Sequence, residues 1–480
     1  MQVKQQRPNI LMIVMDSVRA ANVSCYGYAR PTTPSLDALA AAGTRFDQAV
    51  STGCWTLPVH ASLFTGLYQS AHGVHISSDA LAPDVPTLAE ILRDEGYATG
   101  CLSNNPYISP ATGLARGFDL AEELWRGTHR RIRRSRLSRL ARWLDARGGW
   151  ARPLSGGLAQ LRTWRSRLRR WRNERDGGAA LTNSRAQGWI EQQRAAGKPF
   201  FLFINYMECH EPYQPPSPFR QKFLPRNCSR WHVAAVSQQK RVDAESNGKS
   251  SHDELEILRG LYDGAVNYLD SKIGELTSFL KARGLLDDTA VIVTSDHGDS
   301  LGEHGQIGHR LELYEPLVRV PLVIRYPGRL AAGVTHTDPV ELRDLFPTAL
   351  ELAGADCHEP ADDTGYRAVS LLHPQSADDR PWTFAENKAP QSHGGVVARM
   401  IRSRRQKLIW RSDGRHELYD LERDPGEVQN MIEQEPELAC DLEGELQRWQ
   451  DALTGEAVGA GVAEYGEHVL SRLRDLGYIE

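Results

Sequence analysis

Ala290-Val-Ile-Val-Thr294, followed directly by Ser295-Asp-His-Gly-Asp-Ser-Leu-Gly-Glu-His-Gly-Gln-Ile-Gly-His309, is the stretch that decides the fold. The first five residues predict a buried strand. Asp296 and His297 then stand at its carboxyl end, where open α/β sheets place their chemistry. A carboxylate beside an imidazole is a typical pair of ligands for a divalent cation. The sequence therefore predicts a metalloenzyme built on an α/β sheet.

The composition is that of a soluble globular protein. The chain has 480 residues, of which 40% are hydrophobic and 25% charged, so it can bury a large core. The apolar run at residues 9–16 is too short for a membrane span or a signal peptide, and we expect a cytoplasmic location. Seven cysteines at scattered positions indicate reduced thiols rather than a disulfide framework or a zinc ribbon.

An arginine-rich insert at residues 126–176 concentrates the positive charge. Between Arg126 and Arg175 there are 17 arginines and two acidic residues, while the whole chain has a net charge of −4. Apolar residues at helical spacing predict two basic amphipathic helices. One interpretation is contact with an anionic membrane surface or a polyanionic substrate, or a lid over the active site. The other is a helical hairpin packed on the enzyme or on a second subunit of an oligomer, with solvated arginines. No nucleic-acid specificity is evident.

Alternating strand and helix patterns predict an α/β fold with a doubly wound, mostly parallel sheet covered by helices on both faces. The expected strands are residues 9–15, 44–49, 98–102, 199–205, 290–294 and 320–325, and the expected helices are residues 35–42, 57–65, 85–95, 253–282 and 341–353. After residue 375 the pattern changes to short antiparallel strands, at 394–402, 407–410 and 417–421, and an amphipathic helix at 438–454. We therefore expect a catalytic domain over residues 1–375 and a small C-terminal α+β domain over 376–480.

Four separated segments carry polar residues at predicted strand ends or helix starts. They are Asp16, residues 56–60, residues 205–210, and Asp296-His297 with His309 downstream. Two carboxylates, a hydroxyl and an imidazole form a ligand set for a hard or borderline divalent ion. Because strand ends converge at one sheet edge, we expect these segments to meet.

In these segments the chain resembles the sulfatase branch of the alkaline phosphatase superfamily. The matching stretches cover nearly the whole chain apart from the insert: residues 8–16, 25–28, 33–37, 57–66, 295–309, 313–315, 319–322 and 417–425. The resemblance implies a doubly wound catalytic domain, a small C-terminal domain and one divalent metal beside a nucleophile. Position by position, it puts Asp16, Asp296 and His297 on metal ligands, and Thr56 on the nucleophile, itself at the metal.

The nucleophile position departs from the sulfatase pattern. Sulfatases have Cys or Ser there, two residues before Pro and four before Arg, and oxidise it to formylglycine. Thr56 is a secondary alcohol and cannot become that aldehyde. Cys54 lies four residues before Pro58, out of register, and we interpret it as structural. Thr56 is also a good N-cap for the helix that follows.

Three further departures point away from sulfate. His60 replaces the Arg of the maturation signature, Ser17 replaces a second metal-binding Asp, and His309 replaces an active-site Lys. Fewer carboxylates and more imidazole favour Zn²⁺ or Mn²⁺ over Ca²⁺. Thr nucleophiles in this superfamily belong to phosphatases, phosphodiesterases and headgroup transferases. We therefore predict hydrolysis of phosphate esters, with phosphodiesters slightly favoured over monoesters.

The resemblance also suggests roles for the remaining polar residues. Metal-activated Thr56 would attack phosphorus, and His210 or His309 would protonate the leaving oxygen or activate water, with His60 a further catalytic candidate. Asn104 and Asn105 occupy a position where sulfatases contact the substrate, which would be a small-molecule, lipid or glycan ester. Three alternatives stay open: a sulfate-ester hydrolase, a phosphoryl or headgroup transferase, and a metal-binding pseudoenzyme that binds a polyanion.

Overall fold

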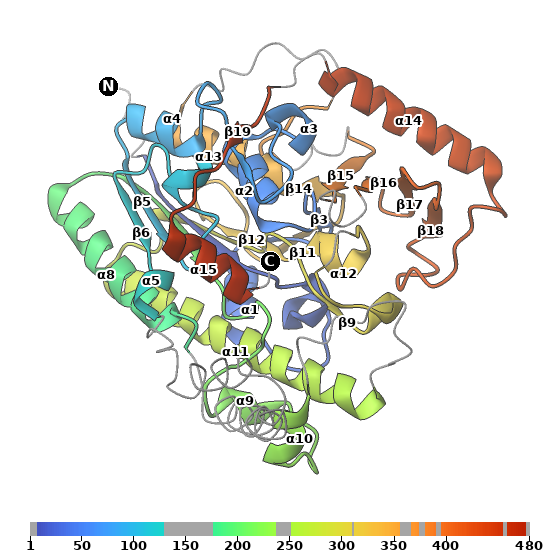
Figure 1. Ribbon diagram of the computed structural model, residues 1–480. Coiled ribbons are helices and arrows are strands. Elements are labelled where there is room, and N and C mark those ends of the chain that lie inside the picture. Colours follow the sequence, from blue (N-terminus) through green and yellow to red (C-terminus); the bar gives the residue numbers. More distant parts are fainter. Residues whose placement is uncertain are drawn as a thin grey trace, which may run out of the picture.

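The computed structural model describes residues 7–128, 176–236, 251–309, 312–355, 366–373, 380–389, 395–454 and 458–476. A large mixed sheet runs through the centre, with helices on both of its faces (Figure 1). A smaller antiparallel sheet stands at one side with a long helix beside it. The arginine-rich insert lies almost entirely outside the described ranges, and so do the predictions of its two helices and of its contact with an anionic surface or membrane. The predicted domain boundary at residue 375 lies outside them as well.

The central sheet has eight strands in the order β13-β2-β12-β8-β1-β7-β5-β6. Its core is parallel: β1 (Asn9–Met15) lies between β7 (Phe200–Tyr206) and β8 (Thr289–Thr294), and β5 (Ala98–Ser103) and β6 (Leu120–Glu123) extend it. Only β12 (Leu322–Arg325) is antiparallel to both of its neighbours, β8 and β2 (Thr44–Phe46), and β13 (Val334–His336) closes that edge parallel to β2. The predicted doubly wound, mostly parallel α/β fold is confirmed.

Alternate side chains of β1 enter two different apolar cores, as the two-residue period of a strand requires. Ile10, Met12 and Val14 pack with α2 (Thr56–Thr65), α4 (Leu88–Asp94) and α13 (Leu345–Ala353). Leu11, Ile13 and Met15 pack on the other face with α1 (Pro34–Ala41), α8 (Ala179–Ala196) and α11 (His252–Ala282). Burial on both faces explains why β1 reads as a continuous apolar run rather than an alternating one.

The strand predicted over residues 44–49 is in fact two strands. β2 belongs to the central sheet, whereas β3 (Ala49–Val50) pairs with β11 (Arg319–Val320) and β14 (Val340–Glu341) in a separate three-stranded sheet. The helix predicted from residue 85 begins at Leu88 instead. Thr87 accepts a hydrogen bond from the Glu90 amide while the Glu90 side chain accepts one from the Thr87 amide, and this capping box fixes the helix start.

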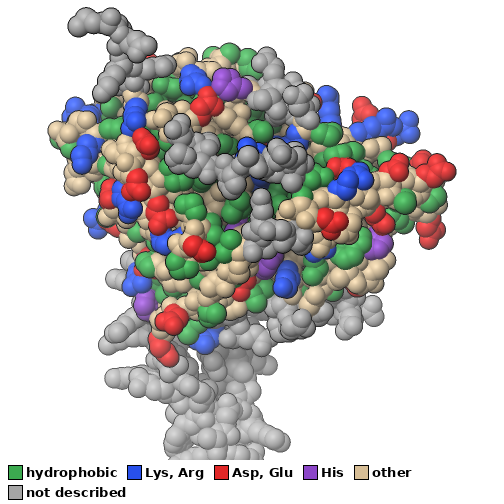
Figure 2. Space-filling view, turned by 90° about the horizontal axis from the view of Figure 1, so that it is seen from above, with side chains coloured by type: hydrophobic (Ala, Val, Ile, Leu, Met, Phe, Trp, Pro, Cys, Tyr) green, Lys and Arg blue, Asp and Glu red, His purple; other side chains and the backbone are tan. Residues whose placement is uncertain are grey.

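The C-terminal antiparallel sheet has the order β15-β16-β17-β18. Its strands are β15 (Thr383–Lys388), β16 (Val397–Arg402), β17 (Gln406–Arg411) and β18 (Glu417–Asp420), and α14 (Pro436–Thr454) packs on it. Acidic and basic side chains of the described residues are interspersed over the face that Figure 2 shows. No helix in the described ranges is long and apolar enough to cross a bilayer.

Candidate active site

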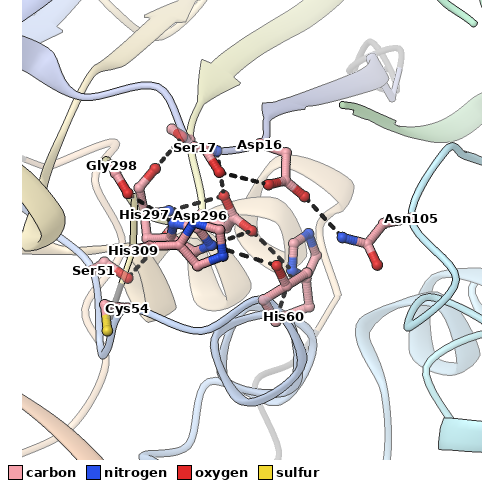
Figure 3. Close-up of polar contacts among 12 residues, drawn as sticks. Asp16, Ser17, Ser51, Cys54, His60, Asn105, Asp296, His297, Gly298 and His309 are labelled. Atoms are coloured by element: carbon pink, nitrogen blue, oxygen red, sulfur yellow. Dashed lines mark hydrogen bonds and ion pairs between the residues drawn. The ribbon is translucent and has the colours of Figure 1, made fainter. Parts of the chain in front are cut away.

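Two neighbouring strands of the sheet bring together three side chains that could hold a metal ion. β1 and β8 are parallel neighbours, so Asp16 and the pair Asp296-His297 follow their strands at the same sheet edge. One ligand atom from each of the three lies within 4.8 Å of the others, and all three residues are buried. Figure 3 shows the two carboxylates and the His297 ring facing one another. The predicted convergence of these segments is therefore what the fold produces.

The Asp296 carboxylate is hydrogen-bonded on one side only. Its Oδ1 accepts from the amides of Ser17 and His297, at 3.2 and 2.9 Å. Its Oδ2 is buried with no hydrogen-bond partner among the described residues. A buried carboxylate oxygen left without a donor costs free energy unless a cation balances it. The orphaned oxygen therefore fits the coordination of a metal ion.

Asp16 is held by donors on both oxygens. The Ser17 hydroxyl donates to Oδ1 at 3.0 Å, and the Asn105 amide donates to Oδ2 at 2.9 Å. Ser17 has a left-handed backbone, with φ of 65°, which is uncommon for a residue other than glycine. At the position where the family resemblance implies a further metal-binding Asp, Ser17 thus supplies donors that orient the carboxylates of Asp16 and Asp296.

The pKa values of the two carboxylates are shifted in opposite directions because their surroundings differ. Burial alone would raise the pKa of Asp16, but the nearby His210 and His297 and the Asn105 amide bring it below its ordinary value. Burial and the adjacent charge of Asp16 raise the pKa of Asp296 to about 8, although His60 partly opposes the shift. Two buried carboxylates that repel each other in this way are the arrangement that a divalent cation stabilises.

His297 presents the correct ring nitrogen for metal binding. Its Nδ1 lies 2.9 Å from the carbonyl oxygen of Gly298, and because a carbonyl only accepts, Nδ1 carries the hydrogen. The lone pair of Nε2 is then available as a ligand. Nε2 lies 3.6 Å from Asp296 Oδ2 and 3.4 Å from the Thr56 hydroxyl oxygen. Two carboxylates, one imidazole and an adjacent hydroxyl form a suitable donor set for one divalent ion.

Thr56 is the first residue of helix α2 rather than its N-cap. The N-cap is Trp55, not Thr56 as predicted. The backbone of Trp55 is extended, and its side chain makes no capping hydrogen bond. The reason is that the helix begins one residue earlier than the Leu57-Pro58 sequence suggests. As a consequence, the Thr56 hydroxyl is directed to His297 instead of to a backbone amide, while it remains at the electropositive helix end.

His60, one helical turn after Thr56, lies under the same cluster. Its Nδ1 donates to the carbonyl oxygen of Thr56 at 2.8 Å and stands 3.8 Å from Asp296 Oδ2. Its Nε2 is buried without a hydrogen-bond partner among the described residues, and its ring packs edge-on against Phe203. His60 therefore joins the predicted site; whether it takes part in catalysis stays a prediction.

His210 and His309 complete the wall of the site. The His309 ring centroid lies 4.5 Å from that of His297 and 4.9 Å from that of His210. His210 Nδ1 donates to the carbonyl oxygen of Glu211 at 2.8 Å. Sequence reasoning missed the partner of His309, which is the buried Asp299: its Oδ1 lies 2.8 Å from His309 Nδ1.

Asn104 and Asn105 have different settings. Asn105 reaches Asp16 and so belongs to the cluster. Asn104 donates from Nδ2 to the Thr182 hydroxyl at 2.9 Å and to the carbonyl oxygen of Asn205, which ties β5 to helix α8 and to β7. Contact between either residue and a substrate stays a prediction.

Cys54 does not share the environment of Thr56. Its Sγ accepts a hydrogen bond from the Asn387 amide at 3.1 Å, and the amide of Cys54 donates to Asn387 Oδ1 at the same distance. In Figure 3 the sulfur points away from Asp296 and His60. Burial raises the pKa of this thiol well above its ordinary value. These contacts are those of a structural cysteine that joins the loop before α2 to β15.

Two family models match the chain. Residues 8–355 match the model described as Sulfatase, which covers most of the chain. Residues 302–452 match the model described as N-sulphoglucosamine sulphohydrolase, C-terminal.

Individual relatives are distant but cover nearly the full length. An arylsulfatase of Clostridium perfringens is 25% identical over 456 residues, covering 89% of this chain and 91% of that protein. A choline-sulfatase of Rhizobium meliloti is 28% identical over 451 residues, covering 89% and 83%. The crystal structure of a phosphonate monoester hydrolase of Agrobacterium radiobacter has a TM-score of 0.71 at 22% identity, with 93% of this chain and 96% of that chain covered. The last comparison shows a shared fold.

Proposed function

The chain belongs to the sulfatase family of metal-dependent ester hydrolases, and within it we propose an enzyme that hydrolyses phosphate esters through a covalent intermediate on Thr56, with phosphodiesters preferred over monoesters. The proposal depends on the presence of threonine at position 56. A threonine cannot be oxidised to an aldehyde at its β-carbon, so its hydroxyl has to attack as an alkoxide. Its oxygen lies 3.4 Å from His297 Nε2, beside the carboxylates of Asp16 and Asp296.

The same residues suggest how a cation would be used. Asp16, Asp296 and His297 would hold it, with Zn²⁺ or Mn²⁺ favoured by the imidazole and the small number of carboxylates. When bound, a divalent ion would lower the pKa of an adjacent hydroxyl and would stabilise negative charge on the ester oxygens.

The protein's own groups account for the remaining steps. The Thr56 oxygen forms a bond to phosphorus as the bond to the leaving oxygen breaks, which gives a phosphothreonine ester. The helix end at Thr56 adds favourable partial positive charge for the anionic group. His210 and His309, whose ring centroids are 4.9 Å apart, would move protons to the leaving oxygen and from the water that resolves the ester.

Charge favours a singly charged ester. The described side chains around the cluster are carboxylates, imidazoles, amides and hydroxyls, and the nearby Arg19 donates to Asn22 and Glu303. A phosphate monoester carries up to two negative charges at neutral pH, whereas a phosphodiester carries one. With one cation against two carboxylates, less repulsion opposes the diester.

Sulfate-ester hydrolysis is the second candidate, favoured by the names of the relatives. A sulfate ester is also singly charged, so charge alone does not separate it from a phosphodiester. The chemistry of the intermediate does, because a threonine ester has to be resolved by attack of water at phosphorus or sulfur. Elimination from an aldehyde hydrate, which avoids that attack, is impossible for Thr56.

A substrate panel with one common leaving group tests the proposal. Bis(p-nitrophenyl) phosphate, p-nitrophenyl phosphate, p-nitrophenyl phenylphosphonate and p-nitrophenyl sulfate would be assayed with Zn²⁺ or Mn²⁺. We expect the highest kcat/KM for the diester, and loss of that activity in Thr56→Ala. A highest kcat/KM for the sulfate ester would contradict the proposed substrate class.

Cys54 provides a matched test of the alternative nucleophile. Cys54→Ala should leave kcat unchanged, because the thiol is bonded to Asn387 and takes no part in the proposed reaction. The variant should lose about 1 kcal/mol of unfolding free energy, the usual contribution of one buried hydrogen bond. Denaturant titration and steady-state kinetics measure the two quantities. A loss of turnover in a folded Cys54→Ala variant would indicate that Cys54, and not Thr56 alone, takes part in catalysis.

A further inference from the structure

We propose that Asp299 is the positioning residue of a proton-transfer dyad, which fixes His309 so that its Nε2 protonates the leaving oxygen and later takes a proton from water. The inference deepens the proposed function and rests on it, because it specifies which histidine handles the leaving group and what makes it able to do so.

A short hairpin brings the two residues opposite each other. β9 (Ser300–Leu301) pairs antiparallel with β10 (Ile307–Gly308), with Ser300 facing Gly308. Asp299 and His309 are the next residues on each side of that pair, and the carboxylate Oδ1 lies 2.8 Å from His309 Nδ1. The turn between the strands contains Gly302 and Gly305, both with positive φ, which other residues adopt at a cost.

Asp299 is itself held in place from several sides. The Tyr213 hydroxyl donates to its second oxygen, Oδ2, and a guanidinium nitrogen of Arg19 donates to its carbonyl oxygen at 3.3 Å. The preceding Gly298 leaves no room for a side chain, since a Cβ there would stand 2.0 Å from the Pro316 carbonyl oxygen. A carboxylate fixed on both oxygens and by its backbone is suited to orient a second group.

The hydrogen bond assigns the two nitrogens of His309 different tasks. A carboxylate accepts, so Nδ1 carries a hydrogen and Nε2 is the nitrogen that exchanges protons. The ring lies among the groups that would surround the ester, 4.5 Å from His297 and 4.9 Å from His210 between centroids. The Nδ1 of His210, by contrast, lies 2.8 Å from the backbone carbonyl oxygen of Glu211, whereas the Nδ1 of His309 lies against a carboxylate.

The proton balance closes over one turnover. In the first half, the bond from Thr56 oxygen to phosphorus forms, the bond to the leaving oxygen breaks, and the proton on His309 Nε2 passes to that oxygen. In the second half, a water oxygen bonds to phosphorus, the bond to Thr56 breaks, and a water proton returns to Nε2. The proton that Thr56 loses on ionisation is regained from solvent at the end. Asp299 stabilises the ring in its protonated state, before the leaving oxygen takes the proton and after water returns one, and it holds the neutral ring in the same orientation in between.

A series of leaving groups tests the dyad. Asp299→Asn and His309→Gln would be compared with wild type on aryl esters that share one transferred group and have phenols of increasing pKa. A proton donor matters little for p-nitrophenol and much for phenol. We expect a small loss of kcat on the activated ester that grows toward about 100-fold on the poorest leaving group, within the usual range for general acid catalysis. The double variant should lose no more than His309→Gln.

Matched tyrosine variants guard against misfolding of the buried Asp299 variant. Tyr213→Phe removes only the hydroxyl that supports Asp299 and should give a weaker loss with the same leaving-group trend. Tyr97→Phe removes a buried hydroxyl that donates to the Pro8 carbonyl oxygen, just before the first residues of β5 and β1 and so at the sheet edge opposite the site, and should show no such trend. An equal loss on every ester in Asp299→Asn and Tyr213→Phe, or an additive double variant, would overturn the dyad. Failure of the proposed function would look different, because activity on all esters would then survive Thr56→Ala.

Discussion

Replacing Thr56 with alanine should reduce kcat by on the order of 10³-fold or more, because it removes the atom that forms the covalent bond. KM should change little, since binding of the ester would depend on the cation and the helix end rather than on the hydroxyl. Thr56→Ser keeps a hydroxyl at the same position, at the start of α2, and should keep measurable activity. Steady-state kinetics on the diester of the panel measures both variants against the wild-type enzyme.

A matched change on the same helix separates chemistry from folding. Thr65, at the far end of α2, is also buried, and its hydroxyl donates to the Ala61 carbonyl oxygen at 2.7 Å. Thr65→Ala should lower the melting temperature more than Thr56→Ala does, and should leave kcat close to wild type. If Thr65→Ala and Thr56→Ala lost turnover equally, Thr56 would be a structural residue of α2 and not a nucleophile.

Removing the metal should have the second largest effect. Treatment with a chelator is expected to lower kcat/KM by on the order of 10³-fold, since a cation supplies several kcal/mol of charge stabilisation. Zn²⁺ or Mn²⁺ should restore activity better than Ca²⁺. Elemental analysis should find about one equivalent of metal per chain, as expected for a single cluster of three ligands. The metal should also raise the melting temperature, because it binds only the folded state.

Asp296→Asn tests the same site without depending on activity. The variant keeps the shape of the side chain but loses the charge, and with it the unpartnered Oδ2 that fits a cation. We expect loss of bound metal and of the metal-dependent rise in melting temperature. Asp270 is a matched control: its carboxylate is buried and accepts from the Ser35 and Leu36 amides at the start of α1. Asp270→Asn should be less stable yet retain its metal, and full metal content in Asp296→Asn would refute the assignment.

The parts of the site that the sequence predicted are those that depend on regular structure. Apolar runs located β1 and β8, and parallel pairing of these strands brought Asp16 and Asp296 together as expected. By contrast, β15 has a polar sequence in which Glu386 and Asn387 are buried. Their partners, Ser70 and Cys54, lie more than 300 residues away along the chain. A strand whose polar side chains are satisfied by such distant partners does not show the alternation that identifies strands.

Two features of the site were also outside the reach of pattern reasoning. The left-handed backbone of Ser17 depends on donors to two carboxylates that come from different strands. The pairing of Asp299 with His309 depends on the register of a hairpin only two residues long on each side. A signal for the hairpin was present, since Gly302 and Gly305 lie midway between Asp299 and His309, but glycines alone do not fix a register.

Trapping the enzyme during turnover tests the central claim most directly. The purified protein, loaded with Zn²⁺ or Mn²⁺, would be mixed with a diester that has a good leaving group, quenched in acid and digested for peptide mass spectrometry. The account predicts a phosphoryl adduct on Thr56, absent from Thr56→Ala and more abundant when resolution by water is slowed in His309→Gln. Turnover by an enzyme that never carries an adduct on Thr56, or an adduct found on another residue such as Cys54, would contradict it.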